Sequence, residues 1–158
     1  MPYLFAALCD LAELALGCKS CKTRILSLPA PPRGPGPNGD RMGGLVYLSS
    51  KRASLKVGVL ATPGDCRALA ERLLGKPASG TFPESIVRGA MCELAYLLAG
   101  GVKRRMIGTG PISVGQPSFL AGAIEPKAGW QVRTTDVELD TIAATLVCVM
   151  RDETAALF

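Results

Sequence analysis

One long segment of helical periodicity constrains the fold more than any other part of the 158-residue chain. It runs from Pro83 to Arg105. At about 100° per residue, four large apolar residues of this segment fall on one line: Val87, Met91, Leu94 and Leu98. Further apolar residues widen the line, on one side Ile86, Ala90 and Leu97 and on the other Ala95 and Ala99. The segment predicts the longest helix of the chain, packed along this line against the core.

The two ends of this helix carry their own signals. Pro83 is tolerated at the start because its missing N–H would have no partner within the helix. Glu84 suits the positive end of the helix dipole, and the basic residues 103–105 suit the negative end. These signals predict that the helix begins at Pro83 and ends at Arg105.

Four residues form a second stripe on the opposite side of the same helix: Gly89, Glu93, Tyr96 and Gly100. We call it the Glu93 stripe. A single carboxylate near a tyrosine and between two glycines, on an otherwise apolar helix, is not typical of an ordinary solvated face. The stripe therefore predicts a surface for a partner. The alternative is that it is only the solvent-exposed side of a core helix.

Composition excludes several kinds of site. The chain has no histidine, which removes Ser-His-Asp and Cys-His catalysis, His-ligated zinc and haem, and histidine phosphorelay. We expect no metal site and no cofactor. The net charge is +5, but no aromatic residue is interleaved with the basic ones, so we expect no nucleic-acid groove. A mildly basic surface can equally attract an acidic protein partner.

The six cysteines do not form a zinc pattern. Only Cys18 and Cys21 have a metal-like or redox-like spacing, and a structural zinc site needs a second pair. Cys66, Cys92 and Cys148 fall on apolar faces, so we expect buried or idle thiols. Scattered free cysteines without a secretion signal predict a reducing cytoplasm.

The first seventeen residues, MPYLFAALCDLAELALG, predict an amphipathic helix of a soluble protein. Asp10 and Glu13 interrupt its apolar run, and a membrane span needs about 18 apolar residues, so we expect no membrane segment. Four residues would face the core: Leu4, Phe5, Leu8 and Leu11. Gly17 would close this helix.

The rest of the chain alternates strands with helices. The predicted elements are a strand at 23–28, a hairpin from 44–48 and 55–60, a helix at 62–75 capped by Thr62 or Asp65, and strands at 112–122, 130–139 and 142–150. On the 62–75 helix, Leu69, Leu73 and Leu74 would supply the apolar side. Pro117 requires an edge or a bulge. This order predicts an α+β fold, a mostly antiparallel sheet packed against one long helix and two shorter ones.

The length suits one domain over residues 1–158. Within it, the segment PAPPRGPGPNGD at 29–40 predicts a flexible loop, because proline and glycine at this density fit neither a helix nor a sheet ladder. A proline-rich ligand for another protein is the alternative for this loop.

Two segments carry a resemblance to the CheX/CheC family of chemotaxis phosphatases. They are CELAYLLAG at 92–100 on the long helix and ISVGQPSFLAG at 112–122 after it. The family shows an acid, an Asn three positions later, then an Ala-Gly pair, then an apolar strand with a proline. The segment TPGDCRALAERLLG at 62–75 is similar to the family's short helix after a hairpin. The looser similarity covers residues 4–150.

The resemblance implies an activity and a partner. In the family the long helix docks on a phosphorylated response regulator of the CheY type, the acid contacts the regulator's active-site lysine, and the Asn amide places a water in line with the aspartyl phosphate. Phosphoryl hydrolysis needs positioning and charge rather than a protein nucleophile. The metal belongs to the regulator. The resemblance places the acid at Glu93, and it also implies a homodimer.

This chain departs from the family pattern at two positions. Tyr96 stands where the family has Asn, and Gly89 stands where it usually has Asp or Ser. A phenol oxygen can bind a water, but further from the backbone than an amide does. Three hypotheses follow. The first is hydrolysis of aspartyl phosphate on a CheY-type regulator with Glu93 and Tyr96 as the catalytic pair. The second is a catalytically impaired module that docks a regulator or another protein through helix 83–105. The third is an assembly domain like the middle domains of flagellar switch proteins.

Overall fold

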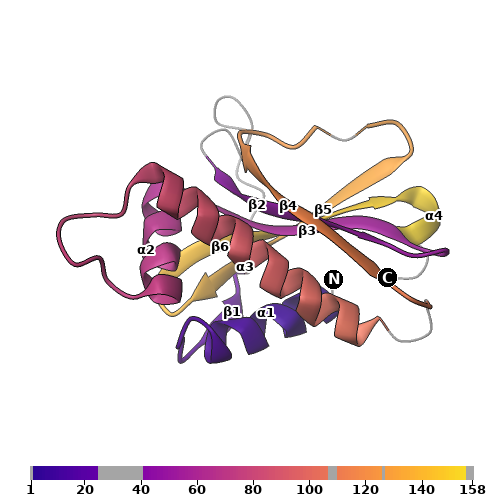
Figure 1. Ribbon diagram of the computed structural model, residues 1–158. Coiled ribbons are helices and arrows are strands. Elements are labelled where there is room, and N and C mark those ends of the chain that lie inside the picture. The colour runs from indigo at the N-terminus through magenta and orange to yellow at the C-terminus, as the bar shows by residue number, and fades with distance from the viewer. Residues whose placement is uncertain (1, 25–40, 107–109, 126, 156–158) are drawn as a thin grey trace.

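The computed structural model describes residues 2–24, 41–106, 110–125 and 127–155. Its helices are α1 (Pro2–Leu14), α2 (Pro63–Leu74), α3 (Glu84–Arg105) and α4 (Asp152–Ala155). Its strands are β1 (Cys21–Thr23), β2 (Met42–Ser49), β3 (Ser54–Ala61), β4 (Ser113–Ala121), β5 (Trp130–Leu139) and β6 (Ile142–Arg151). Figure 1 shows α3 lying diagonally across the strands, with α1 and α2 beside it.

The six strands form one sheet in the order β1-β5-β6-β3-β2-β4, and every neighbouring pair is antiparallel. The predicted α+β class is confirmed: an antiparallel sheet packs against a long helix and two shorter ones. The short helix α4 was not predicted, because four residues give too short a window for any periodicity.

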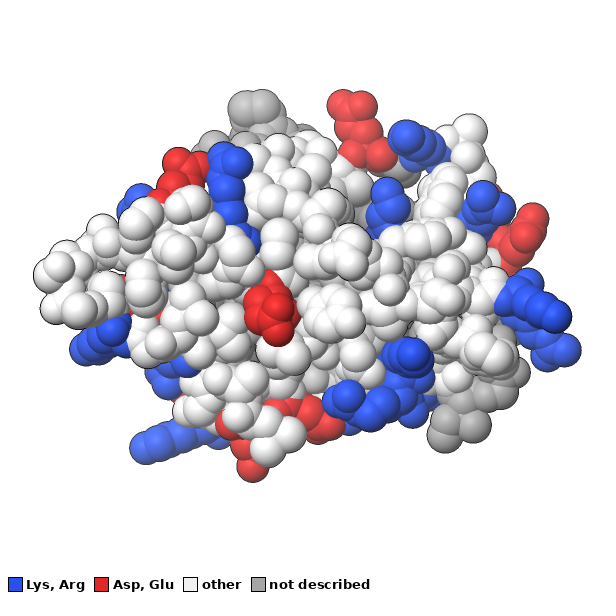
Figure 2. All heavy atoms as spheres, viewed as in Figure 1, with Lys and Arg blue, Asp and Glu red and all other residues white. Residues whose placement is uncertain are grey.

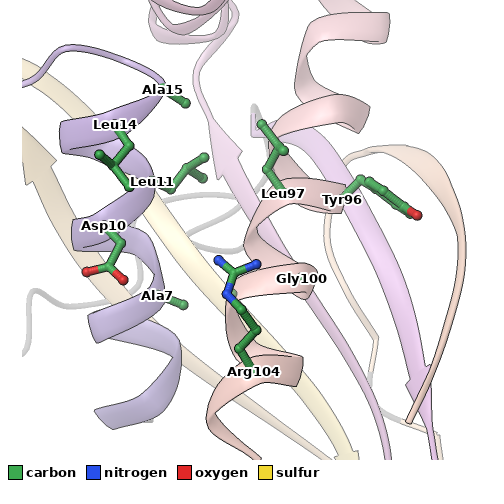
Figure 3. A pocket seen from close by; sticks show the side chains of 10 residues that line it. Ala7, Asp10, Leu11, Leu14, Ala15, Tyr96, Leu97, Gly100 and Arg104 are labelled. Atoms are coloured by element: carbon green, nitrogen blue, oxygen red, sulfur yellow. The ribbon is translucent and has the colours of Figure 1, made fainter.

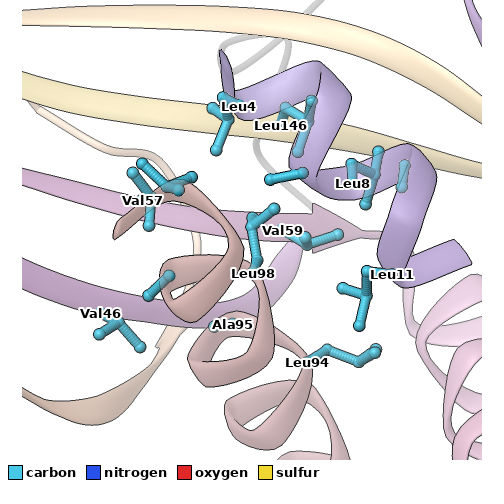
Figure 4. Close-up of a cluster of buried hydrophobic side chains, with 14 of the residues drawn as sticks. Leu4, Leu8, Leu11, Val46, Val57, Val59, Leu94, Ala95, Leu98 and Leu146 are labelled. Atoms are coloured by element: carbon cyan, nitrogen blue, oxygen red, sulfur yellow. The ribbon is translucent and has the colours of Figure 1, made fainter. Parts of the chain in front are cut away.

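The main core lies between the helices and one face of the sheet. Figure 4 shows this layer, in which Leu8 of α1 and Leu98 of α3 meet Val59 and Leu146 of the sheet. Strand β6 shows the alternation that a sheet imposes, because Leu146 belongs to this core while Val147 belongs to a smaller apolar cluster. The predicted core side of α1 is confirmed, since Leu4, Leu8 and Leu11 are buried and Phe5 packs partly buried against them.

The predicted hairpin is β2–β3, in which Val46 pairs with Val57. Glycine allows α3 to approach this hairpin closely. A Cβ built on Gly44 would lie 2.3 Å from the backbone oxygen of Met91, well inside any real contact distance. The glycine in β2 therefore sets how near the helix lies to the sheet.

The predicted capping signals are realised at α2, whereas α3 begins one residue later than predicted. Thr62 is the N-cap of α2 and accepts a hydrogen bond from the backbone N–H of Asp65, and Gly75 ends the helix with φ 84°. Pro83 lies at the N-cap of α3, so the first helical residue is Glu84 rather than the proline.

Three expectations need correction or lie outside the described residues. Leu74 is 52% exposed and is not part of the apolar side of α2, because it falls at the last position of that helix. The strand predicted at 23–28 begins earlier, as β1, and its residues 25–28 lie outside the described part. The loop predicted at 29–40 lies wholly outside it.

The expectation for Pro117 is confirmed twice. Strand β4 is at the edge of the sheet, and its register with β2 shifts between Val46 and Leu48, next to the pair Val46–Pro117. A residue without a backbone N–H is tolerated at such a place because it breaks no ladder hydrogen bond.

Among the described helices, α3 alone is long and apolar enough, by length and composition, to cross a membrane. Half of its most apolar window is buried within the fold. The packing of its buried face against the sheet and against α1 and α2 accounts for its apolar character.

Candidate functional site

Helix α3 has one buried and one exposed face, as its sequence predicts. The predicted core line of Val87, Met91, Leu94 and Leu98 is at most 4% exposed. On the other face, Gly89 and Glu93 are exposed, Tyr96 is 45% exposed and Gly100 is half-buried. The structure therefore places all four residues of the Glu93 stripe on one accessible surface.

Two residues predicted on the core side are exposed instead. Ile86 is 43% exposed and Leu97 is 37% exposed. On a regular helix they lie about 20° and 40° from Glu93, so they border its stripe rather than the core line. Sequence reasoning assigned them to the core because both are large and apolar. They give the exposed face an apolar margin.

The electrostatic character of this face is simple. Figure 2, which views the molecule from the α3 side, shows a largely uncharged surface with one acidic side chain isolated in it. Glu93 is the only acid of α3 after Glu84. Within the part of the chain that the structure describes, neither Glu93 nor Tyr96 has a hydrogen-bond or ion-pair partner. Both polar groups are thus free to bind a partner.

Arg88 lies further round α3, on the side of the helix that faces β4. It forms an ion pair with Glu84, with 2.7 Å between Nη2 and Oε1, and its guanidinium lies 4.9 Å from the centre of the Phe119 ring. The pairing neutralises the charge of Glu84 at the start of α3. Of the two carboxylates on α3, a helix that the structure describes in full, Glu93 is therefore the one without a compensating charge.

A groove of about 330 Å³ borders the stripe, between α1 and α3. Figure 3 shows Leu11 and Leu97 pointing into the groove, whereas the ring of Tyr96 points away from α1. Leu14 also lines it and is 85% exposed. Sequence reasoning missed this groove, since it is made by two helices about eighty residues apart.

An ion pair holds the two walls of the groove together. Arg105 of α3 donates hydrogen bonds to the Asp10 carboxylate of α1 and, over 3.1 Å, to the backbone oxygen of Gly101. Close packing adds to it, because a Cβ on Gly101 would lie 3.0 Å from the Cβ of Ala7. The relative position of α1 and α3 is therefore fixed by both packing and charge.

The cysteines are placed largely as expected. Cys66 and Cys148 are buried, and burial raises the pKa of each thiol to about 11. Cys92, on α3, is half-buried. Among the described residues no group of three or more Cys, Asp or Glu side chains is arranged to hold a metal ion.

Comparison with known proteins adds to this geometry. No protein-family model matches the sequence, and no curated protein matches it. Among solved structures, the chemotaxis protein CheX from Vibrio vulnificus is similar over 96% of this chain and 95% of its own, with a TM-score of 0.73 and 15% identity. The chain has the fold of CheX. The fold implied by the resemblance to the CheX/CheC family is thereby confirmed.

Two further structures share this CheX-like fold. One is the CheX–CheY–BeF3–Mg²⁺ complex from Borrelia burgdorferi, with a TM-score of 0.65, 16% identity and 96% of each chain covered. The other is the middle domain of FliM from Vibrio alginolyticus, with a TM-score of 0.57, 10% identity, and 99% of this chain and 93% of that one covered.

Proposed function

We propose that this CheX-like chain binds a CheY-type response regulator through the Glu93 stripe of α3. The observation that carries the proposal is the exposure of Glu93 and Tyr96 side by side, both without partners in the described chain. A structure of the same fold has been solved in complex with CheY, which supports this class of partner.

The chemistry of the stripe defines the surface that it would bind. Gly89 and Gly100 carry no side chain, so a partner can approach the backbone of α3 on either side of Glu93. The margin of Ile86 and Leu97 offers apolar contact. A lone carboxylate within such a surface binds most strongly to a lysine or arginine, because a charge covered by the partner is costly unless it is paired. The regulator's active-site lysine is the cation that the resemblance implies.

Hydrolysis of the regulator's aspartyl phosphate is the second candidate, favoured by the fold and by the position of Glu93. Tyr96 argues against an efficient reaction. Its oxygen is carried on a rigid ring beyond the place that an amide would reach, and misplacing an orienting group by about 1 Å costs roughly 10²-fold in rate. We therefore propose docking as the main function, and slow hydrolysis at most.

The first experiment measures binding of the full chain to a panel of CheY-type regulators, each with and without BeF3⁻ and Mg²⁺ to mimic phosphorylation. We expect Glu93→Gln to weaken binding at least about tenfold, since it removes the charge and keeps the shape. Glu84→Gln is the matched control, because Glu84 lies on the same helix but off the stripe and is already paired with Arg88.

Three outcomes would contradict docking through the stripe. They are no binding to any regulator, equal binding by the Glu93→Gln variant, or a larger loss from Glu84→Gln than from Glu93→Gln. Binding to flagellar switch components in place of regulators would favour an assembly role, which the likeness to the FliM middle domain supports. The homodimer implied by the resemblance stays a prediction, to be tested by light scattering of the same samples.

A further inference from the structure

Two cysteines from separate elements meet at the edge of the fold. Cys9 lies on α1 and Cys21 is the first residue of β1, and their Sγ atoms are 3.0 Å apart. Both residues are half-buried. They line an open hollow of about 550 Å³ together with Glu13, Cys18, Lys19 and Ser20, so small reagents can reach them from solvent.

The backbone around both cysteines is held in place. After α1, Gly17 turns the chain with φ 60°, and the N–H of Cys18 donates to the oxygen of Ala12 over 2.8 Å. The carboxylate of Asp140 then accepts from the N–H groups of Lys19 and Ser20, over 2.9 and 2.8 Å.

The antiparallel pairing of Cys21 with Leu139 of β5 fixes the residue that follows this turn. The approach of Cys9 and Cys21 is therefore a product of the fold and not of a loose segment.

Cys18 is the thiol that sequence spacing would pair with Cys21. In the structure it is 7% exposed, and its Sγ is directed to the backbone oxygen of Leu16 at 4.0 Å. Burial is the largest of the effects that raise the pKa of the Cys18 thiol. The geometry thus separates Cys18 from the pair, although it lies in the same hollow.

We propose that Cys9 and Cys21 are a redox-active pair, which a low-molecular-weight disulfide such as oxidised glutathione converts to a protein disulfide. The Cys9 thiolate attacks one sulfur of the oxidised glutathione, a Cys9–glutathione bond forms, the glutathione S–S bond breaks, and the first glutathione leaves as a thiolate that takes up a proton. The Cys21 sulfur then attacks the Cys9 sulfur, the protein S–S bond forms, and the second glutathione leaves with the Cys21 proton. The two protein thiols lose two electrons, which reduce one oxidised glutathione to two reduced ones.

The order of attack follows from the surroundings of Cys21. Burial, and then its hydrogen bond with Cys9, raise the pKa of Cys21, which favours its thiol form. Such a thiol is a poor first nucleophile, but once Cys9 carries glutathione it is already in place to complete the exchange.

The disulfide would join α1 to the outermost strand of the sheet. The residues enclosed by the link include Leu11 and Leu14, which line the groove beside the Glu93 stripe. Oxidation would fix this wall of the groove to β1. It would also reduce the number of conformations open to the unfolded chain, which stabilises the folded state. This inference stands apart from the proposed function, because it depends only on the two sulfurs and their surroundings.

The test treats the full reduced chain with oxidised glutathione at increasing ratios to reduced glutathione and counts free thiols under denaturing conditions. We expect the count to fall from the six of the sequence by two. Cleavage with trypsin alone would leave Cys9 and Cys18 in one peptide, residues 1–19. Adding a protease that cuts after glutamate separates them at Glu13, and the expected product is residues 1–13 linked to residues 20–22.

Cysteine variants and thermal unfolding distinguish a Cys9–Cys21 disulfide from a link through another cysteine. Cys9→Ser and Cys9→Ala should each abolish the link, whereas Cys18→Ser and Cys92→Ser should each keep it. Oxidation should raise the Tm by about 6 to 12 °C in the unsubstituted chain and leave it unchanged in the Cys9 variants. A link between residues 14–19 and 20–22, retention of the link without Cys9, or only glutathione adducts on single cysteines would overturn the proposal.

Discussion

Gly44 of β2 lies directly beneath the backbone carbonyl of Met91 on α3. This contact brings the helix that carries Glu93 close to the sheet, and it leaves no room for a methyl group, since a Cβ at position 44 would lie 2.3 Å from that oxygen. The obstacle is backbone, which cannot rotate away as a side chain can. The position of the candidate docking face therefore depends on a residue that has no side chain.

Gly44→Ala should destabilise the protein by about 2–3 kcal/mol, because the helix or the strand must move to admit the methyl group. Urea unfolding at neutral pH measures the change. Gly89→Ala is the matched control, since nothing lies within 4 Å of its added Cβ and alanine favours a helix. We expect that control to gain up to about 1 kcal/mol. Equal stability of the Gly44→Ala variant and the unsubstituted chain would contradict the close approach.

Thr62→Ala should cost about 1 kcal/mol, because the backbone N–H of Asp65 loses the side-chain oxygen that it binds at 3.2 Å. Thr62→Ser keeps that oxygen and should lose much less. Thermal and urea unfolding of both variants measure the difference. If Thr62→Ser lowers the free energy of unfolding as much as Thr62→Ala does, the hydroxyl cap is not what stabilises the start of α2.

Asp140 should make stability depend on acidic pH. Hydrogen bonds from the backbone of Ser20, and then from that of Lys19, hold the pKa of its carboxyl below the ordinary value of 3.8, and Arg72 at 3.2 Å acts in the same direction. Folding therefore favours the charged form. The contribution of the Asp140 carboxylate to the free energy of unfolding is present above pH 4 and is lost as the pH falls through the lowered pKa.

Asp140→Asn tests this dependence without disturbing the turn. Residue 140 has φ 54°, and asparagine tolerates this left-handed conformation. We expect the variant to be less stable than the unsubstituted chain by the same amount at pH 7 and pH 5, with the gap closing below about pH 4. Urea unfolding at the three pH values checks it. A gap that stays constant down to pH 3 would show that the charge of Asp140 is not involved.

Tyr96→Asn should increase the release of phosphate from a phosphorylated CheY-type regulator by about tenfold or more over the unsubstituted chain. The amide restores the group that the CheX/CheC resemblance places there to hold the attacking water. The assay follows regulator phosphate with time, and Tyr96→Ala controls for removal of the ring. Adding Glu93→Gln to Tyr96→Asn should lower the rate again. Unchanged hydrolysis by a Tyr96→Asn variant that still binds would contradict the transferred mechanism.

Local sequence determined much of this protein. The spacing of Val87, Met91 and Leu98 predicted both the extent of α3 and its buried face, because a helix repeats every 3.6 residues whatever surrounds it. The cap at Thr62 and the edge position of Pro117 followed from the hydrogen-bonding capacity of single residues. The exposure of Glu93 and Tyr96 followed from the same helical periodicity.

Tertiary packing sets which apolar residues remain exposed and which residues distant in sequence come into contact. Ile86 and Leu97 look like core residues by composition, yet they are exposed because the sheet and the flanking helices cover only part of α3. The groove forms between α1 and α3, and Cys9 of α1 meets Cys21 at the start of β1. Nothing in the sequence indicates either contact. Periodicity and capping are properties of neighbouring residues, whereas these contacts depend on how whole elements pack.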